Sequence, residues 1–181
     1  MGFSTTQMQL DPSNGALASL QLETESQDVE VNVLSGEHTF DLPVVAHANT
    51  VINVAAGASL TLGGTVDFDG VKLSKLGSGA VYVQQAAGFG SGTVELHDGT
   101  LTWEGDLNGD LLADTGVIAP GIHMGHLDVK GDFTLGAAAT LELDIAGPSS
   151  SSNDLLTVDD AAATSRRSPA SRRRRTGLSW S

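Results

Sequence analysis

The stretch "GVKLSKLGSGAVYVQQAAGFGSGTVELHDGTL", residues 70–101, decides the fold because short alternating runs recur in it between glycines. The runs are "VKL" (71–73), "AVYV" (80–83) and "TVELHDGTLTW" (93–103). In each run apolar residues stand at positions i and i+2, so they share one side of a strand while polar neighbours share the other. The turn sequence "LGSG" separates the first two runs, and "HDG" divides the third into two alternating halves. This pattern predicts short β-strands joined by tight turns.

The same alternation continues on both sides, in "VEVNV" (29–33), "SLTL" (59–62), "TVDF" (65–68), "HLDV" (126–129), "DFTL" (132–135) and "TLELDI" (140–145). A unit of glycine followed by alternating apolar residues recurs. Repeated short strands of one type suit coils stacked on their neighbours better than a sandwich or barrel. We therefore expect an all-β chain that folds as a parallel β-solenoid.

The domain organisation predicted from this pattern has three parts. Residues 51–163 carry the solenoid repeats, and residues 1–50 form an N-terminal cap or irregular β region, in which 15–27 fits either a short helix or an irregular cap. Residues 164–181 form a basic, disordered tail. The chain has 181 residues with 22 glycines, no cysteine and only 4% aromatic residues. The core must then be built from Val, Leu, Ile and Ala, and disulfides, thiol nucleophiles and thiolate metal sites are excluded.

The charge is strongly asymmetric. Residues 1–163 carry Lys72, Lys75 and Lys130 against all 22 acidic residues, and every arginine lies between Arg166 and Arg175. Such a body repels nucleic acid and anionic membrane surfaces. No apolar run reaches the length of a membrane span. The start "MGFSTTQMQL" lacks the pattern of a signal peptide, which leaves a cytoplasmic protein or a missing N-terminus as alternatives.

The quoted stretch resembles the autotransporter-associated β-strand repeat. The matching residues are Leu73, Lys75, Gly77 and Gly79 in the first half, and Gly92, Val94, Leu96, Gly99 and Leu101 in the second. "GVIAPGIHMGHLDVKGDFTLGAAATLELDIAG" and the later "NDLLTV" are similar to recurrent stretches of the same proteins, so the resemblance covers roughly residues 50–160. It implies a right-handed parallel β-helix from the passenger region of a large bacterial protein, secreted or at the cell surface.

The tail "TSRRSPASRRRRTGLSWS" (164–181) shares no composition with the rest of the chain. One hypothesis is that a frameshift replaces the natural ending, so that the chain is a piece of a longer protein. The alternative is a genuine basic arm that binds polyanions.

A metal site is the first chemical possibility, because His123 and His126 stand three residues apart and Asp128 follows on the side of the strand that His126 occupies. Zinc needs three or four ligands in fixed geometry. Two histidines at this spacing outside a helix have no fixed geometry relative to each other, and the HExxH pattern is absent. The interpretation favoured by the sequence is exposed turn histidines.

A calcium loop is the second possibility, in "GDLNGDLLAD" (105–114). Loop positions 1, 3, 5, 6 and 12 would be Asp106, Asn108, Asp110, Leu111 and Val117. Position 6 requires glycine and position 12 a bidentate acid, so both departures break the motif. The sequence favours solvated turn acids. A weak calcium site along one edge of the coils, made by Asp106, Asp110 and Asp114, stays open.

A glycan-cleaving site is the third possibility, since the acidic pairs Asp67 and Asp69, or Glu142 and Asp144, alternate onto one outward side. Glycosidases need two carboxyls at a set separation. Polysaccharide lyases of this shape usually use Lys or Arg, and residues 1–163 contain three lysines and no arginine. Outward alternation explains these acids better. Tyr82 and Trp103 are interpreted as packing residues rather than a sugar-stacking platform.

We therefore predict a structural or adhesive β-solenoid segment of a secreted or cell-surface bacterial protein, with no catalytic, cofactor-binding or metal-binding residues. Its expected partners are a host or matrix surface, glycans or neighbouring copies, with no nucleic acid and no membrane span. The alternatives are a polysaccharide lyase or hydrolase, or a glycan- or calcium-binding module, on the same fold.

Overall fold

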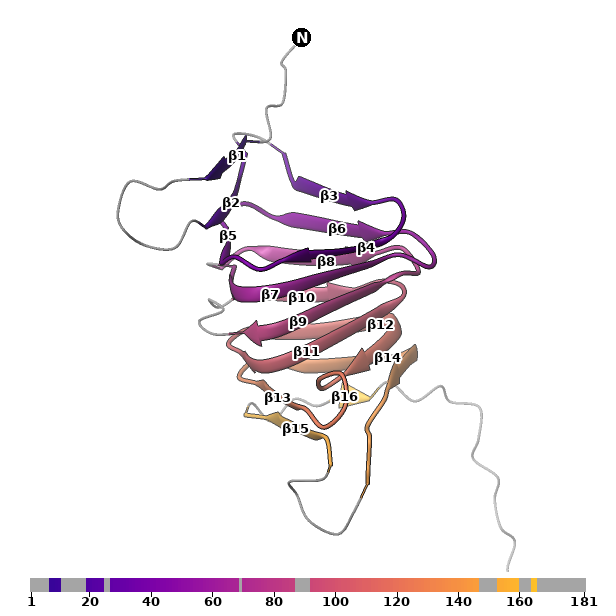
Figure 1. Cartoon of the computed structure of the whole chain (residues 1–181). Coiled ribbons are helices and arrows are strands. Elements are labelled where there is room, and N and C mark those ends of the chain that lie inside the picture. The colour runs from indigo at the N-terminus through magenta and orange to yellow at the C-terminus, as the bar shows by residue number, and fades with distance from the viewer. Residues whose placement is uncertain are drawn as a thin grey trace, which may run out of the picture.

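The computed structural model describes residues 7–10, 19–24, 27–68, 70–86, 92–146, 153–159 and 164–165. The chain winds into a β-solenoid of about five turns, without a helix in these residues (Figure 1). The predicted all-β solenoid is thus confirmed. Its strands are β1 (Gln7–Leu10), β2 (Leu20–Glu23), β3 (Val29–Val33), β4 (Glu37–Phe40), β5 (Val44–Ala46), β6 (Thr50–Val54), β7 (Ser59–Asp67), β8 (Lys72–Leu76), β9 (Ala80–Ala86), β10 (Thr93–Leu96), β11 (Thr100–Leu107), β12 (Asp110–Ala119), β13 (His126–Val129), β14 (Phe133–Leu141), β15 (Leu155–Val158) and β16 (Thr164–Ser165).

The strands form three parallel stacks, which the chain visits in a fixed order. The first stack holds β3, β6, β8, β10, the first halves of β12 and β14, and β16. The second holds β4, the first halves of β7, β9 and β11, and the second halves of β12 and β14. The third holds β2, β5, the ends of β7, β9 and β11, then β13 and β15. All these pairs are parallel, and β1 pairs with β2 in the antiparallel sense.

The strand register repeats the same inward positions turn after turn. One inward row of the first stack consists of Val29, Thr50, Leu73, Val94, Leu111 and Phe133. All six side chains are buried, and successive members stand 17 to 23 residues apart. Other rows are mainly Val, Leu, Ile and Ala, as the composition predicts. The core is therefore a continuous column rather than a single central cluster.

The strand boundaries differ from the predicted ones where the chain turns a corner. The predicted runs 59–62 and 65–68 are two halves of β7, whose register shifts between Leu62 and Thr65 where it passes from the second stack to the third. Residues 105–114, predicted as a turn, instead contribute the end of β11 and the start of β12. Adjacent Leu111 and Leu112 break the alternation there, which hides the strand.

The parallel stacks begin before residue 51. Strand β2 pairs in parallel with β5, and β5 pairs in parallel with β7. Strands β3 and β4 are the first described strands of the other two stacks. The helix considered for residues 15–27 is wrong at 20–23, which form β2, while 15–18 lie outside the described residues. Of the predicted tail, residues 164–165 form β16, and 166–181 lie outside the described residues.

Glycines occupy the corner between the first and second stacks. Gly57 and Gly99 both have a φ of +74°, a left-handed conformation that glycine adopts without steric cost. Their surroundings differ. A Cβ on Gly99 would lie 2.3 Å from the carbonyl oxygen of Gly79 and 2.5 Å from that of Gly77, whereas a Cβ on Gly57 would meet nothing within 4 Å. Backbones of successive turns therefore touch directly at Gly99.

Gly99→Ala and Gly57→Ala form a matched pair that separates backbone strain from close contact. In both variants the free energy of unfolding should fall by about 1–2 kcal/mol, because alanine is strained in the left-handed conformation. Gly99→Ala should lose clearly more, because its methyl group collides with rigid carbonyls. Urea unfolding of the two variants measures the difference. Equal destabilisation would mean that the turns can move apart at this corner.

Candidate functional site

The two histidines considered as a metal pair, His123 and His126, do not belong to the same group of side chains in the structure. His123 lies exposed in the turn that precedes β13, and His126 is the first residue of β13. The structure instead brings His126 together with Asp106 and Asp128, whose ligand atoms all lie within 4.8 Å of one another. Among the described residues, His123 joins no such group. Asp128, considered from the sequence as a third ligand beside the histidine pair, does lie close to His126, but Asp106 takes the place of His123 in this group.

This group, called here the β11–β13 triad, stands on the outer side of the third stack. Asp106 and Asp128 are direct partners in the register of β11 and β13. His126 precedes Asp128 by two residues in the same strand, so both side chains point outward. The intervening Leu127 and the following Val129 are fully buried in the core. The backbone positions of all three residues are therefore fixed by strands that are packed against the core.

Further contacts hold the carboxylate of Asp128. The Thr157 hydroxyl donates to its Oδ1 at 2.7 Å, and Lys130 Nζ donates to its Oδ2 at 2.5 Å. The hydrogen bonds from Lys130 and Thr157 keep the pKa of Asp128 below its ordinary value. Lys130 also lies 3.0 Å from the carboxylate of Asp159. Asp128 is consequently ionised and oriented, with Lys130 shared between two acids.

The calcium edge considered from the sequence does not form. Asp106 lies in the third stack, whereas Asp110 and Asp114 belong to β12, which runs from the first stack into the second. The carboxylate of Asp110 accepts a hydrogen bond from the backbone N–H of Asp132 at 2.9 Å, and Asp114 pairs with His97. Asp110 and Asp114 therefore serve separate local contacts, and Asp106 belongs to the β11–β13 triad.

A second polar network crosses the outer side of the first stack. Glu95 on β10 lies 3.2 Å from both Lys72 Nζ and His97 Nε2, and its Oε2 accepts from the Ser74 hydroxyl at 3.3 Å. The other ring nitrogen of His97 lies 3.2 Å from Asp114 on β12. These side chains connect three successive turns. Sequence reasoning missed the network because only the register shows that Glu95 stands opposite Ser74.

Glu95 should make stability depend on pH in the acidic range. Desolvation acts to raise its pKa, but hydrogen bonds from Lys72 and His97 and their charges outweigh it, so the pKa is lowered. The folded state then binds its proton more weakly than the unfolded state. The stabilisation is present above the unfolded pKa and is lost as pH falls through the folded pKa. Chemical unfolding of the wild type and of Glu95→Gln is measured between neutral pH and pH 3. The difference between their free energies of unfolding should shrink as the pH falls, and a difference that does not depend on pH would contradict this prediction.

Lys75 is buried in the core. It occupies an inward row between Ile52 and Leu96 and is 1% exposed. Its Nζ donates to the main-chain carbonyls of Leu76 at 2.9 Å, Gly77 at 2.6 Å and Asp98 at 3.0 Å. Burial lowers the pKa of Lys75 to about 8, against the opposing charge of Asp98. In the sequence, the sign of this inward position is that Lys75 stands two residues after the apolar Leu73 and so shares its side of the strand.

Lys75→Met should change how stability responds to alkaline pH. The folded pKa of Lys75 is about 8, and an unfolded lysine titrates near ~10.4. Between these values the unfolded chain binds more protons, so wild-type stability should rise with pH relative to Lys75→Met, by up to about 1.4 kcal/mol per pH unit.

The measurement is urea unfolding at several values between pH 7 and pH 10. Lys72→Met is the matched control, because it removes a partly exposed, outward-facing lysine three residues away and should keep the wild-type alkaline slope. If Lys75→Met shows the same slope as the wild type, the buried amine is not the group that titrates.

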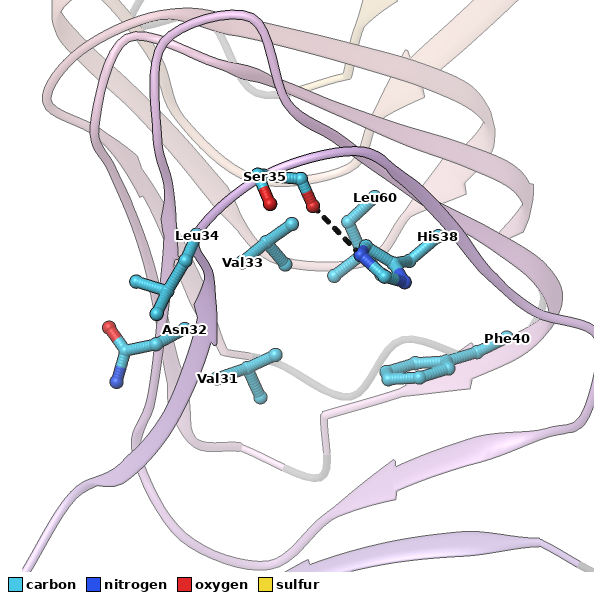
Figure 2. A pocket seen from close by; sticks show the side chains of 8 residues that line it. All are labelled: Val31, Asn32, Val33, Leu34, Ser35, His38, Phe40 and Leu60. Carbon is cyan, nitrogen blue, oxygen red and sulfur yellow. Dashed lines mark hydrogen bonds between the residues drawn. The ribbon is translucent and has the colours of Figure 1, made fainter.

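A cavity of about 370 Å³ opens at the end of the core where β3 and β4 lie (Figure 2). It is lined by Val31, Asn32, Val33, Leu34, Ser35, His38, Phe40 and Leu60. His38 Nε2 lies 2.9 Å from the carbonyl oxygen of Ser35, and it is the one titratable side chain of this lining. In the described part of the chain β3 and β4 begin their stacks, so this cavity is the open end of the core column.

The structure places three of the four residues of the acidic pairs considered from the sequence. Asp67 lies on β7, and Asp69 lies outside the described residues. Glu142 and Asp144 are exposed beyond the end of β14, where the backbone N–H of Asp144 donates to Asp154. Trp103 is 1% exposed, which confirms that it packs in the core.

Comparison with known proteins gives no match for this chain among family models, curated proteins or solved structures. The resemblance to the autotransporter-associated repeat therefore stays a prediction. In the described residues no helix has the length and apolarity of a membrane span.

Proposed function

We propose that this chain is a structural β-solenoid segment of a secreted or cell-surface bacterial protein, which extends and displays other parts without catalysis. The continuous core supports this proposal best. Buried rows run along all three stacks, from Val29 to Phe133 in the first. Each turn is hydrogen-bonded to the turns before and after it, so stiffness accumulates along the solenoid axis.

The outer surface supports a display or adhesive role through its charge. Outward positions carry exposed acids such as Glu30, Glu104, Asp106 and Asp110. Such a surface repels polyanions and keeps copies of the chain apart in solution. The partners that fit it are neutral glycans and matrix or host surfaces that offer cationic groups.

The proposal predicts that display depends on the core and not on outward side chains. The chain is anchored to beads through its C-terminus, with an epitope at its N-terminus, and exposed to a broad-specificity protease. The wild type should retain the epitope. Leu101→Asp should lose it rapidly, because the carboxylate would be buried in a fully packed row. Thr100→Asp is the matched control. The side chain of Thr100, the residue before Leu101, points outward, so this variant should behave as the wild type.

Two outcomes would overturn the proposal. The first is loss of the epitope from the wild type as fast as from Leu101→Asp, which would remove the case for a rigid spacer. The second is catalysis. The full chain is incubated with neutral and acidic polysaccharides, and new reducing ends are measured. Turnover that Glu95→Gln abolishes would replace the spacer with a polysaccharide-cleaving enzyme.

A further inference from the structure

The β11–β13 triad has an arrangement that its protein contacts do not account for. Asp106 and Asp128 stand directly opposite each other on neighbouring strands. Like charges in that position destabilise a sheet unless a cation lies between them. Lys130 neutralises Asp128 and Asp159. Within the described residues, no hydrogen bond or ion pair engages the side chains of Asp106 or His126. Asp106 therefore lacks a lysine partner of the kind that Asp128 has, and the basic group beside it is the imidazole of His126, whose charge also contributes to the lowered pKa of Asp128.

The donor atoms specify the kind of cation that would fit. One imidazole nitrogen and two carboxylate oxygens lie within 4.8 Å of one another. Imidazole suits zinc, copper and nickel ions, whereas calcium takes oxygen ligands. Three protein ligands with open remaining positions match the ligand count of zinc sites that keep a water or an external ligand.

The surroundings of Asp128 also resemble the support that metal ligands receive. The Thr157 hydroxyl donates to one carboxylate oxygen and fixes the plane of the group. Hydrogen bonds of this kind orient ligating carboxylates. Lys130 opposes a metal ion because its ammonium occupies the other oxygen, but Asp159 offers it a second partner 3.0 Å away. A bound cation can therefore displace Lys130 toward Asp159 without leaving the ammonium unpaired.

We propose that Asp106, His126 and Asp128 bind a divalent transition-metal ion of the zinc class. The ion joins β11 to β13, and thus two successive turns of the third stack. This site is independent of the proposed display function: it adds a metal-dependent clamp to the solenoid and leaves coordination positions open toward solvent.

The test is a calorimetric titration of the untagged, chelator-treated chain with Zn²⁺ at neutral pH, together with thermal unfolding. We expect one dominant Zn²⁺ site per chain and a higher unfolding temperature in its presence. His126→Ala and Asp106→Asn should each weaken Zn²⁺ binding at least tenfold. Lys130→Met should strengthen it, because the competing ammonium is gone. The same concentration of Ca²⁺ should leave the unfolding temperature unchanged.

Two histidine variants serve as controls. His123→Ala removes an exposed imidazole three residues from His126, and His97→Ala removes the histidine that lies between Glu95 and Asp114. Neither should change the affinity for Zn²⁺. The proposal is wrong if the wild type binds no Zn²⁺, or if His126→Ala binds it as tightly as the wild type does. Equal responses to Zn²⁺ and Ca²⁺ would also overturn it, since they would indicate attraction to the acidic surface alone.

Discussion

The in-register parallel pairing of successive turns is the constraint on which the rest of this structure depends. Side chains alternate with a period of two along each strand, so a slip by one residue would turn every inward residue of that strand outward. Leu101, Val81 and Leu60 are paired in register and all three are buried. The core is correct only while every turn keeps that register, which makes each turn dependent on its neighbours.

The same constraint explains the unusual residues of the interior. Stacked corners bring main chains into contact, so glycine is required at Gly99, where any Cβ would strike carbonyl oxygens of the preceding turn. Carbonyls that point into such a corner need donors. Lys75 supplies them from an inward position and links the carbonyl of Gly77 to that of Asp98 on the next turn. A lysine in an apolar row is thus a consequence of tight corners, not an exception to the core.

The sequence predicted many of the strands and the composition of the core, but not how the strands pair. Alternation located β3, β9 and β13, and the aliphatic composition predicted the core. It did not locate β12, because Leu111 and Leu112 are adjacent and the turn from Val94 to Leu111 is only 17 residues long. Periodicity tells which side a residue faces, but the residue it pairs with depends on turn lengths that vary. Hence Asp128 was recognised beside His126, whereas Asp106 was grouped with the wrong aspartates.

Stacking also determines where chemistry can arise on the outside of a solenoid. Outward residues meet across turns, so an acidic surface brings acids together unless polar or cationic residues alternate with them. On the first stack Glu95 faces Ser74 and is flanked by Lys72 and His97, so its charge is balanced within the protein. On the third stack Asp106 faces Asp128. Lys130, which contacts Asp128, is shared with Asp159, and His126 lies beside the pair. Where the register sets acid against acid on such a surface, a bound cation would reduce the repulsion, which is the physical basis of the site proposed at the β11–β13 triad.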